Sequence, residues 1–282
     1  MSTLRLPGSQ RGGGPNSVRR RIAVATWRPS KDGRIYARMA IDATAVLEYV
    51  ERTRARTGER VTITHVVGAA LARAIRDVPE VRARVVLGRI VEFKTCDIGF
   101  AVDIEGGNDL APARVRSADE KTPVDISREL APVAVGLRAG TDAGHRHTSR
   151  YFRHLPWWTL RPLIGFAGLI VSGFGFDAFG QKGFPLGSAF VSNVGTLGLD
   201  EGFLAPAPFA RVPVYLAIGA VQDAPTVVDG AVVVRPQLVL VATADHRLVD
   251  GAHAGKIVQV MRRLLADPSV MDAPYAGVAD NH

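Results

Sequence analysis

The octapeptide ADHRLVDG, residues 244–251, connects two segments with different hydrophobic patterns. Before it stands the apolar run LVLVATA, residues 238–244, which predicts a buried strand, and after it we expect a helix over residues 252–266. His246 therefore lies where a strand leaves the core. A neutral imidazole at such a place can act as a general base when another group fixes its tautomer. The alternative is a structural histidine at a strand end, whose ring nitrogens are hydrogen-bonded and take no part in catalysis.

Two charged residues of the same octapeptide are candidates for stabilising the turn. Asp250 and the arginine next to the histidine, Arg247, are expected to form a local salt bridge that makes the turn rigid. Gly251 permits tight backbone geometry before the helix. The octapeptide therefore predicts a strand, a rigid turn with an ionisable ring, and a helix.

The composition describes a chain that can bury a full core. It has 282 residues, of which 47% are hydrophobic, and no shift in composition divides it. The single cysteine, Cys96, excludes an internal disulfide and a cysteine-rich zinc site, so we expect a reducing compartment, the cytoplasm. Residues 1–16 contain glycine and arginine but no apolar stretch of the signal-peptide type, and we expect them to be a disordered basic tail.

The formal net charge of +8 is compatible with an anionic partner. Apart from Arg19–Arg21, however, the arginines are scattered, and no aromatic residues alternate with them, so nucleic acid is not an expected partner. The uncharged segment 162–176 is shorter than the ~20 residues of a membrane-spanning helix. We expect it to be a buried or interface-lining helix, and membrane contact is not expected.

The hydrophobic pattern mixes helices and strands without regular alternation, which predicts an α+β sandwich rather than a doubly wound sheet. Asp42, Thr64 and Thr122 are expected helix N-caps, and the dipeptide Asp229-Gly230 is the expected turn of a hairpin. We expect strands at 34–42, 82–94, 97–105, 110–116, 188–195, 213–221, 226–234 and 235–245, and helices at 43–58, at 65–78, from 123 onward and at 252–266.

Several of these motifs together resemble one known family. DHRLVDG, followed by a helix that ends in LLADPSVM, is similar to the signature of the 2-oxo acid dehydrogenase acyltransferases, the E2 catalytic domain with the chloramphenicol acetyltransferase-like fold. FVSNVGTLG, residues 190–198, resembles the serine strand of that family. RRRIA, DIGFAVDIEGG and LAPARVRSADEKTPVDISREL resemble its opening helix, its central strands and the helix that follows. The resemblance covers roughly residues 17 to 271, and it implies a trimer of two-layer α+β sandwiches, with residues 17–282 as the catalytic domain.

The resemblance also implies roles for individual residues. His246 would be the general base that takes a proton from the attacking thiol, and Ser192 would donate a hydrogen bond to the oxyanion of the tetrahedral intermediate. Without the family, Ser192 would be interpreted as a strand serine bonded to its neighbours. Asp250 would be structural and would tie the histidine turn to an arginine near the N-terminus, for which Arg20 is our choice.

Asn193 and Gly195 would shape the serine loop at the substrate site. The implied reaction moves an acyl group between two thiols, that of coenzyme A and that of a dihydrolipoyl-type carrier, with coenzyme A as a substrate. In this family the histidine and the serine approach each other across a subunit boundary, which implies a homotrimer, and trimers can build larger assemblies. The resemblance implies no metal.

Two departures from the family qualify this interpretation. Classical members carry a lipoyl domain and a subunit-binding domain, for which this chain offers no sequence, so we expect no lipoyl group in it and a lipoyl-bearing protein as the carrier in trans. The segment 144–187 is also longer and more apolar than expected. The alternatives are therefore a stand-alone acyltransferase of the same fold with a different, hydrophobic acyl substrate or acceptor, and a non-catalytic scaffold. His145 and His147 are interpreted as solvated histidines of a loop at 141–156 rather than metal ligands.

Overall fold

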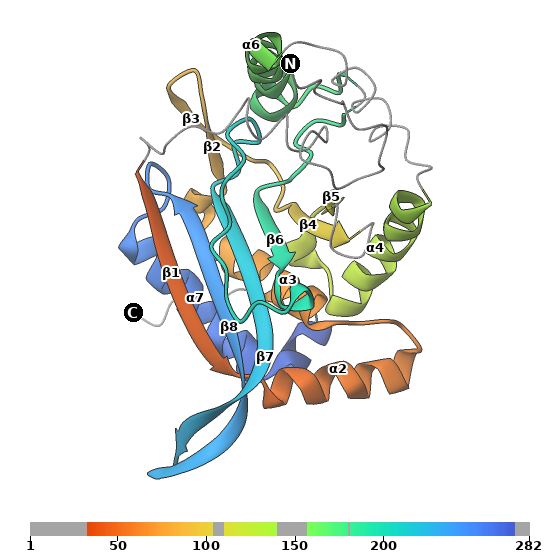
Figure 1. The fold of residues 1–282 in the computed structure, drawn as a ribbon, viewed down its shortest axis with the longest axis vertical. Helices are drawn as coiled ribbons and strands as arrows, with labels where there is room; N and C mark the ends of the chain where they lie inside the picture. Colours follow the sequence, from red (N-terminus) through yellow and green to blue (C-terminus); the bar gives the residue numbers. More distant parts are fainter. Residues whose placement is uncertain (1–32, 104–109, 140–156, 180, 274–282) are drawn as a thin grey trace, which may run out of the picture.

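A computed structural model describes residues 33–103, 110–139, 157–179 and 181–273 of the chain. Within these residues, one mixed sheet is covered on one face by helices (Figure 1). The strands of this sheet are β1 (Arg34–Asp42), β4 (Ile98–Asp103), β5 (Leu110–Val115), β6 (Ala189–Asn193), β7 (Val214–Val228) and β8 (Ala231–Asp245). The covering helices are α2 (Thr44–Thr57), α3 (Ile63–Arg76), α4 (Pro123–Arg138) and α7 (Gly251–Ala266). This arrangement confirms the predicted α+β sandwich.

The sheet has the strand order β1-β8-β7-β6-β4-β5. β6 pairs in parallel with both β4 and β7, and the other pairs are antiparallel. β7 and β8 form one long hairpin whose turn is Asp229-Gly230, as predicted. Both turn residues have positive φ, 51° and 79°, which matches the right-handed twist of the strands. Figure 1 shows this hairpin extending beyond the helical layer at the bottom of the view.

A smaller hairpin of β2 (Ala83–Val86) and β3 (Arg89–Glu92) forms a sheet of its own. The sequence predicted strand structure over this whole segment, and the structure interrupts it at Leu87-Gly88, where φ is 49° and 77°. Short single-turn helices connect other elements: η1 (Pro79–Val81), η2 (Ala118–Glu120), η4 (Gly195–Leu197) and η5 (Pro268–Asp272). The β2–β3 hairpin lies at the upper end of the main sheet in Figure 1, the end at which β8 finishes.

Of the predicted helix caps, Thr122 is the observed N-cap, and Asp42 lies one residue before the observed one. Thr122 caps α4: its hydroxyl accepts a hydrogen bond from the backbone N–H of Asp125 at 3.1 Å, which confirms the prediction. Asp42 accepts a hydrogen bond from the N–H of Thr44 at 2.8 Å, but the N-cap of α2 is the next residue, Ala43. α2 ends, as expected, at Gly58, whose φ of 71° is left-handed.

The predicted cap of α3 is wrong by two residues. The N-cap is Thr62 rather than Thr64, because Thr62 can form a reciprocal pair with His65: the N–H of Thr62 donates to Nδ1 of His65 at 3.1 Å. Burial, together with the nearby Arg54, lowers the pKa of His65 to about 4, so the ring is neutral and Nδ1 can accept. Thr64 does not cap the helix, and its Oγ1 instead accepts a hydrogen bond from Asn193 at the end of β6.

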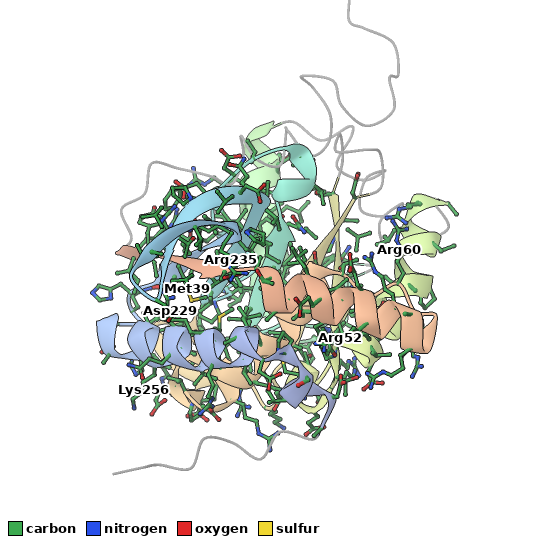
Figure 2. All side chains as sticks on the ribbon, turned by 90° about the horizontal axis from the view of Figure 1, so that it is seen from below. Met39, Arg52, Arg60, Asp229, Arg235 and Lys256 are labelled. Atoms are coloured by element: carbon green, nitrogen blue, oxygen red, sulfur yellow. The ribbon has the colours of Figure 1, made fainter. Side chains whose placement is uncertain are left out.

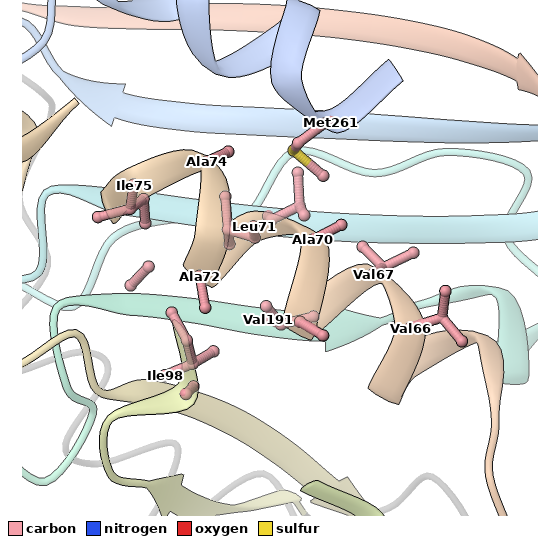
Figure 3. Packing of buried hydrophobic residues seen from close by; sticks show 14 of the residues in the cluster. Val66, Val67, Ala70, Leu71, Ala72, Ala74, Ile75, Ile98, Val191 and Met261 are labelled. Carbon is pink, nitrogen blue, oxygen red and sulfur yellow. The ribbon is translucent and has the colours of Figure 1, made fainter. Parts of the chain in front are cut away.

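The core lies between the sheet and α3, which is buried on all sides along Val66–Ile75. Figure 3 shows α3 between strand residues such as Ile98 and Val191 and, on its other side, Met261 of α7. Gly68 permits this close approach, because a Cβ there would lie 2.5 Å from the ring of Phe100. The outer sides of the helices are polar. Figure 2 shows Arg52 and Lys256 on α2 and α7, and both side chains are exposed.

The apolar segment before the serine strand forms α6 (Trp157–Gly168) and then a π-helical turn, η3 (Leu169–Phe174). Arg84 of the main body binds its backbone: Nε donates to the carbonyl of Gly173 at 2.9 Å. Its outer side exposes Phe166, Phe174 and Phe176, so the segment is not fully buried within one chain, and the alternative of an interface-lining helix stays a prediction. Among the helices of the described residues, none is both long and apolar enough to cross a membrane. The predicted loop at 141–156 lies outside the described residues.

Candidate active site

His246 lies in a tight turn between β8 and α7, as the sequence predicted. Its N–H donates to the carbonyl of Gly33 at 3.0 Å, and the N–H groups of Leu248 and Val249 both donate to the carbonyl of Asp245 at 2.9 Å. These bonds close the turn directly after the strand, so the backbone of His246 is held on both sides. The imidazole itself is exposed in the single chain.

The tautomer of His246 follows from its hydrogen bond to the backbone. Nδ1 lies 2.9 Å from the carbonyl oxygen of Val249. A carbonyl oxygen can only accept, so a neutral ring that makes this bond carries its hydrogen on Nδ1 and leaves the lone pair of Nε2 available. This is the arrangement that a general base needs. The partner is a backbone atom, so no side-chain pattern in the sequence could have indicated it.

The salt bridge of this turn differs from the predicted one. Arg247 pairs with Asp245 rather than Asp250: its Nη2 lies 2.6 Å from Oδ2 and its Nε lies 2.9 Å from Oδ1. Burial alone would raise the pKa of Asp245, but the hydrogen bonds from Arg247 outweigh burial and lower it. Asp250 is instead the N-cap of α7, where it accepts from the N–H of His253 at 3.0 Å, and this bond lowers the pKa of Asp250. The cap competes for the carboxylate that the predicted salt bridge required.

Ser192 lies on β6 and points to the sheet face opposite the helices. The alternation along β6 places its neighbours Val191 and Asn193 toward α3 and Ser192 toward the other side, beside Ala217 of β7. The serine is only 6% exposed. Among the described residues, none makes a hydrogen bond to its hydroxyl, so the group is available to donate to a ligand.

The other residues predicted for the serine loop have clear contacts. Asn193 donates from Nδ2 to Oγ1 of Thr64 at 3.0 Å, and its Oδ1 accepts from the N–H of Thr196 at 3.3 Å. A Cβ on Gly195 would lie 2.5 Å from backbone atoms of Gly219 and Ala220, so only glycine fits there. Both residues hold the backbone that follows Ser192. A direct role for them in binding substrate stays a prediction, and Arg20 lies outside the described residues.

His246 and Ser192 are not close to each other within one chain. Ser192 is opposite Ala217 on β7, Ala217 is opposite Val241 on β8, and His246 follows the end of β8. Residues advance about 3.4 Å along a strand and neighbouring strands lie about 4.8 Å apart, so the two Cα atoms are roughly 15 to 20 Å apart. A thioester carbonyl cannot contact both groups at that distance. If the two side chains act on one substrate, they must come from two copies of the chain.

Within the described part of the chain, no three His, Cys, Asp or Glu side chains form a group that could hold a metal ion. His145 and His147 lie outside the described residues. The polar groups of the candidate site are an imidazole whose Nδ1 bonds a backbone carbonyl, a serine hydroxyl, and two carboxylates of lowered pKa in the histidine turn.

Several sequence relatives and solved structures resemble this chain, among them two relatives whose sequences match over most of it. The acetyltransferase component of the pyruvate dehydrogenase complex of Rhizobium meliloti is 27% identical over 213 residues, which cover 75% of this chain and 38% of that protein. The mitochondrial succinyltransferase component of the 2-oxoglutarate dehydrogenase complex of Saccharomyces cerevisiae is 25% identical over 237 residues, which cover 82% of this chain and 42% of that protein. The chain thus spans about two fifths of the length of these relatives.

The structural likenesses show the same fold. A probable dihydrolipoamide acetyltransferase of Listeria monocytogenes matches with a TM-score of 0.64 and 17% identity, over 99% of this chain and 98% of that one. The dihydrolipoamide acetyltransferase of Azotobacter vinelandii matches with a TM-score of 0.62 and 19% identity, over 86% of this chain and 85% of that one. These neighbours confirm the expected E2-type fold.

The model of one family matches the chain in two ranges, residues 16–145 and 182–272. The unmatched residues between them include α6 and η3, the segment that the sequence had already marked as a departure. The matched ranges contain the serine strand, the histidine turn and the helix that follows. The chain belongs to the family of 2-oxoacid dehydrogenases acyltransferase catalytic domains.

Proposed function

We propose that this chain is a coenzyme A-dependent acyltransferase that moves an acyl group between the thiol of coenzyme A and that of a dihydrolipoyl-type carrier. The observation that carries the proposal is the hydrogen bond between Nδ1 of His246 and the carbonyl of Val249, because it leaves Nε2 as the base. Family membership supports it, as do relatives that are named dihydrolipoyllysine-residue acyltransferases. We assign this activity to residues 17–282.

The chemistry requires a proton acceptor and a donor to one oxygen. An alkyl thiol such as that of cysteine has a pKa near 8.5, so at neutral pH the attacking thiol must lose its proton. Nε2 of His246 takes that proton while the sulfur attacks the thioester carbon, and the electron pair of the C=O bond moves to the oxygen. The hydroxyl of Ser192 donates a hydrogen bond to this oxyanion. When the C=O bond reforms, the original C–S bond breaks and the leaving sulfur takes the proton back from His246.

We further propose that each site is built by two copies of the chain, one supplying His246 and the next supplying Ser192. The separation of the two residues along the sheet supports this, and a closed ring of three copies gives three equal sites. The Azotobacter enzyme was studied for the role of a serine, a histidine and an asparagine four residues after the histidine in its catalytic mechanism. Asp250 stands at the same spacing after His246 here, and we propose that it positions the turn rather than reacting.

The test compares three variants in one exchange assay with acetyl-coenzyme A and free dihydrolipoamide. His246→Ala is expected to lower kcat by about 10²- to 10⁴-fold, because the base is lost. Ser192→Ala is expected to lower it by about 10²- to 10³-fold, because the oxyanion loses its donor. The control is Lys256→Ala, which changes an exposed residue of α7 and is expected to leave kcat within about twofold. Equal, measurable rates for wild type and His246→Ala would contradict His246 as the base, and a wild type without activity would support the non-catalytic scaffold.

One observation favours a variant of this function with a hydrophobic acyl substrate. The segment that the family model does not match exposes Phe166, Phe174 and Phe176, which are apolar groups available to a long acyl chain or to an apolar acceptor. A series of acyl-coenzyme A substrates from acetyl to octanoyl tests this. A kcat/KM that rises with chain length supports the hydrophobic substrate, and a kcat/KM that falls contradicts it.

A further inference from the structure

The segment formed by α6 and η3 is apolar on two adjoining sides, of which the chain buries only one. The inner side carries Leu160, Ile164 and Val171, which are buried. The outer side carries apolar residues that are exposed or half-buried: Leu163, Phe166, Ile170 and Phe174. Steps of three and four residues place these side chains on one face of the helix. A helix that is apolar all round is normally buried all round, so the outer side lacks a cover among the described residues.

The exposed apolar surface continues beyond the helix. Phe176 is exposed, and its ring centroid lies 6.4 Å from that of Phe174. The tip of the β2–β3 hairpin adds Leu87, whose neighbour Val86 lies beside η3: a Cβ on Gly173 would be 3.6 Å from its Cγ1. Figure 1 shows α6 and this hairpin at the same end of the molecule. We call the α6 patch the exposed side chains of Leu87, Leu163, Phe166, Phe174 and Phe176. Exposed apolar groups that gather in this way mark interaction sites.

The inner side is fixed to the rest of the chain, so the α6 patch is held facing outward. Nε of Arg84 donates to the carbonyl of Gly173 at 2.9 Å, near the end of the segment. In its middle, Gly168 lies against Phe209, because a Cβ there would be 2.8 Å from the Cβ of Phe209. The segment is anchored at both points and cannot turn its phenylalanines toward the core without losing these contacts.

Positive charge predominates around the α6 patch. The exposed cations next to it are Arg89, Arg161 and Lys182. The carboxylate of Asp177 accepts from the N–H of Gly183 at 2.8 Å, which places the preceding residue, Lys182, close to the end of the segment. A second exposed carboxylate, Glu92, lies at the end of β3 that is remote from the hairpin tip. The excess of cations agrees with the net charge of +8 of the whole chain and favours an anionic partner.

We propose that the α6 patch docks on an anionic lipid surface, with its phenylalanines among the acyl chains and Arg89, Arg161 and Lys182 beside the headgroups. A segment with one exposed apolar side and flanking cations lies in the plane of a membrane interface rather than across it. This agrees with the absence of a membrane-spanning helix among the described residues. A second copy placed on the patch by a two-fold axis would bring the same cations together, which costs free energy.

The sequence gave no expectation of membrane contact because the segment is too short to span a bilayer. Length does not decide whether a helix lies on a bilayer, and the outward direction of the phenylalanines is visible only in the structure. The inference goes beyond acyl transfer and does not depend on it. It is also independent of whether the same phenylalanines contact a hydrophobic acyl substrate.

Cosedimentation of the whole chain with lipid vesicles tests the proposal. One vesicle type is phosphatidylcholine alone, and the other is an equal mixture of phosphatidylcholine and phosphatidylglycerol. The wild type is expected to bind the mixed vesicles at least about tenfold more tightly, and added salt is expected to reduce this difference. Phe166→Gln combined with Phe176→Gln is expected to weaken binding to mixed vesicles at least about tenfold, because two aromatic rings no longer insert.

A second variant tests the charges. Arg161→Gln combined with Lys182→Gln is expected to weaken binding to mixed vesicles about tenfold or more and to leave binding to phosphatidylcholine vesicles unchanged. Its matched control is Arg52→Gln combined with Lys256→Gln, which removes the same charge from the exposed sides of α2 and α7 (Figure 2). This control is expected to bind within about twofold of the wild type.

The matched control for the phenylalanines is Val232→Gln combined with Val234→Gln. These valines are 73% and 72% exposed on the β7–β8 hairpin, at the opposite end of the molecule (Figure 1). The control is expected to bind within about twofold of the wild type. Circular dichroism checks that each variant is folded. If the phenylalanine variant does not fold, hydrogen exchange of the wild type replaces it: mixed vesicles are expected to slow exchange in α6 and η3 and not in the β7–β8 hairpin.

Three results would overturn the proposal. The first is a wild type that does not sediment with mixed vesicles at up to about 5 mM lipid, where even weak binding is visible. The second is equal binding by the wild type and the phenylalanine variant, or equal exchange of α6 with and without vesicles. The third is a phenylalanine variant whose copies dissociate in the absence of lipid, seen by native mass spectrometry, because the patch would then be covered by a second copy. Turnover is not part of these measurements, so none of the three results bears on acyl transfer.

Discussion

Replacing Gly195 by alanine should damage the serine loop by direct collision. Gly195 begins η4, two residues after Asn193, the last residue of β6. Its φ is not positive, so the cost of a side chain there is steric. The added Cβ would lie 2.5 Å from the N of Ala220 and from the C and O of Gly219. These are backbone atoms of β7, which cannot rotate away. Overpacking of this kind costs about 1–3 kcal/mol, and in a domain of this size each kcal/mol lowers Tm by about 2–4 °C.

The loop must move to relieve this collision, and Ser192 lies at its start. A displacement of about 1 Å at a catalytic donor can lower kcat by about 10²-fold. Urea unfolding and the exchange assay are therefore measured on the same preparation. The control is Gly202→Ala, whose Cβ would meet only the side chain of Val194 at 3.4 Å. Wild-type stability and kcat in Gly195→Ala would refute the close contact with β7 and the role given to the loop.

Three further predictions concern stability. Thr122→Ala removes the cap of α4 and should lower the free energy of unfolding by about 1 kcal/mol in urea; an unchanged midpoint would contradict the cap. His65 has a lowered pKa of about 4 in the folded state, so the unfolded state binds more protons between about pH 4 and 6.5, and stability should fall with acidification in that window. His65→Gln should flatten this part of the pH profile, and an equally steep profile in the variant would be inconsistent with a buried neutral ring. The pKa of Asp245 is also lowered, so its salt bridge stabilises above the unfolded pKa of about 3.9, and the loss caused by Asp245→Asn should disappear as the pH falls below the folded value.

Local chemistry made several elements predictable from the sequence. Asp229-Gly230 supplies two residues that tolerate positive φ, and the long hairpin follows from them. Thr122, followed by proline, gives the start of α4 without any knowledge of the tertiary structure. The apolar run before His246 and the glycine at residue 251 place the histidine between a strand and a helix. Each of these predictions depends on interactions within a few residues.

The features that the sequence did not predict depend on contacts between distant residues or on competition for one group. The N-cap of α3 is Thr62 because the side chain of His65, three residues later, accepts a hydrogen bond from the N–H of Thr62. Thr64 has no such partner. Asp250 did not pair with the arginine of its turn because the first amides of α7 take its carboxylate. The positive φ of Arg211, whose side chain bonds the distant carbonyl of Val85, is marked by no local pattern.

Mixing two inactive variants tests the shared site most directly. His246→Ala and Ser192→Ala chains are purified separately, combined in equal amounts, unfolded and refolded together. In a closed trimer each interface joins one histidine donor to one serine donor, so about one quarter of the interfaces in random mixed trimers regain both groups. The account predicts that the mixture recovers roughly a quarter of wild-type activity, although each variant refolded alone recovers about 1% or less. A mixture as inactive as its separate components, in preparations shown by native mass spectrometry to contain trimers of both variants, would contradict a site built from two copies.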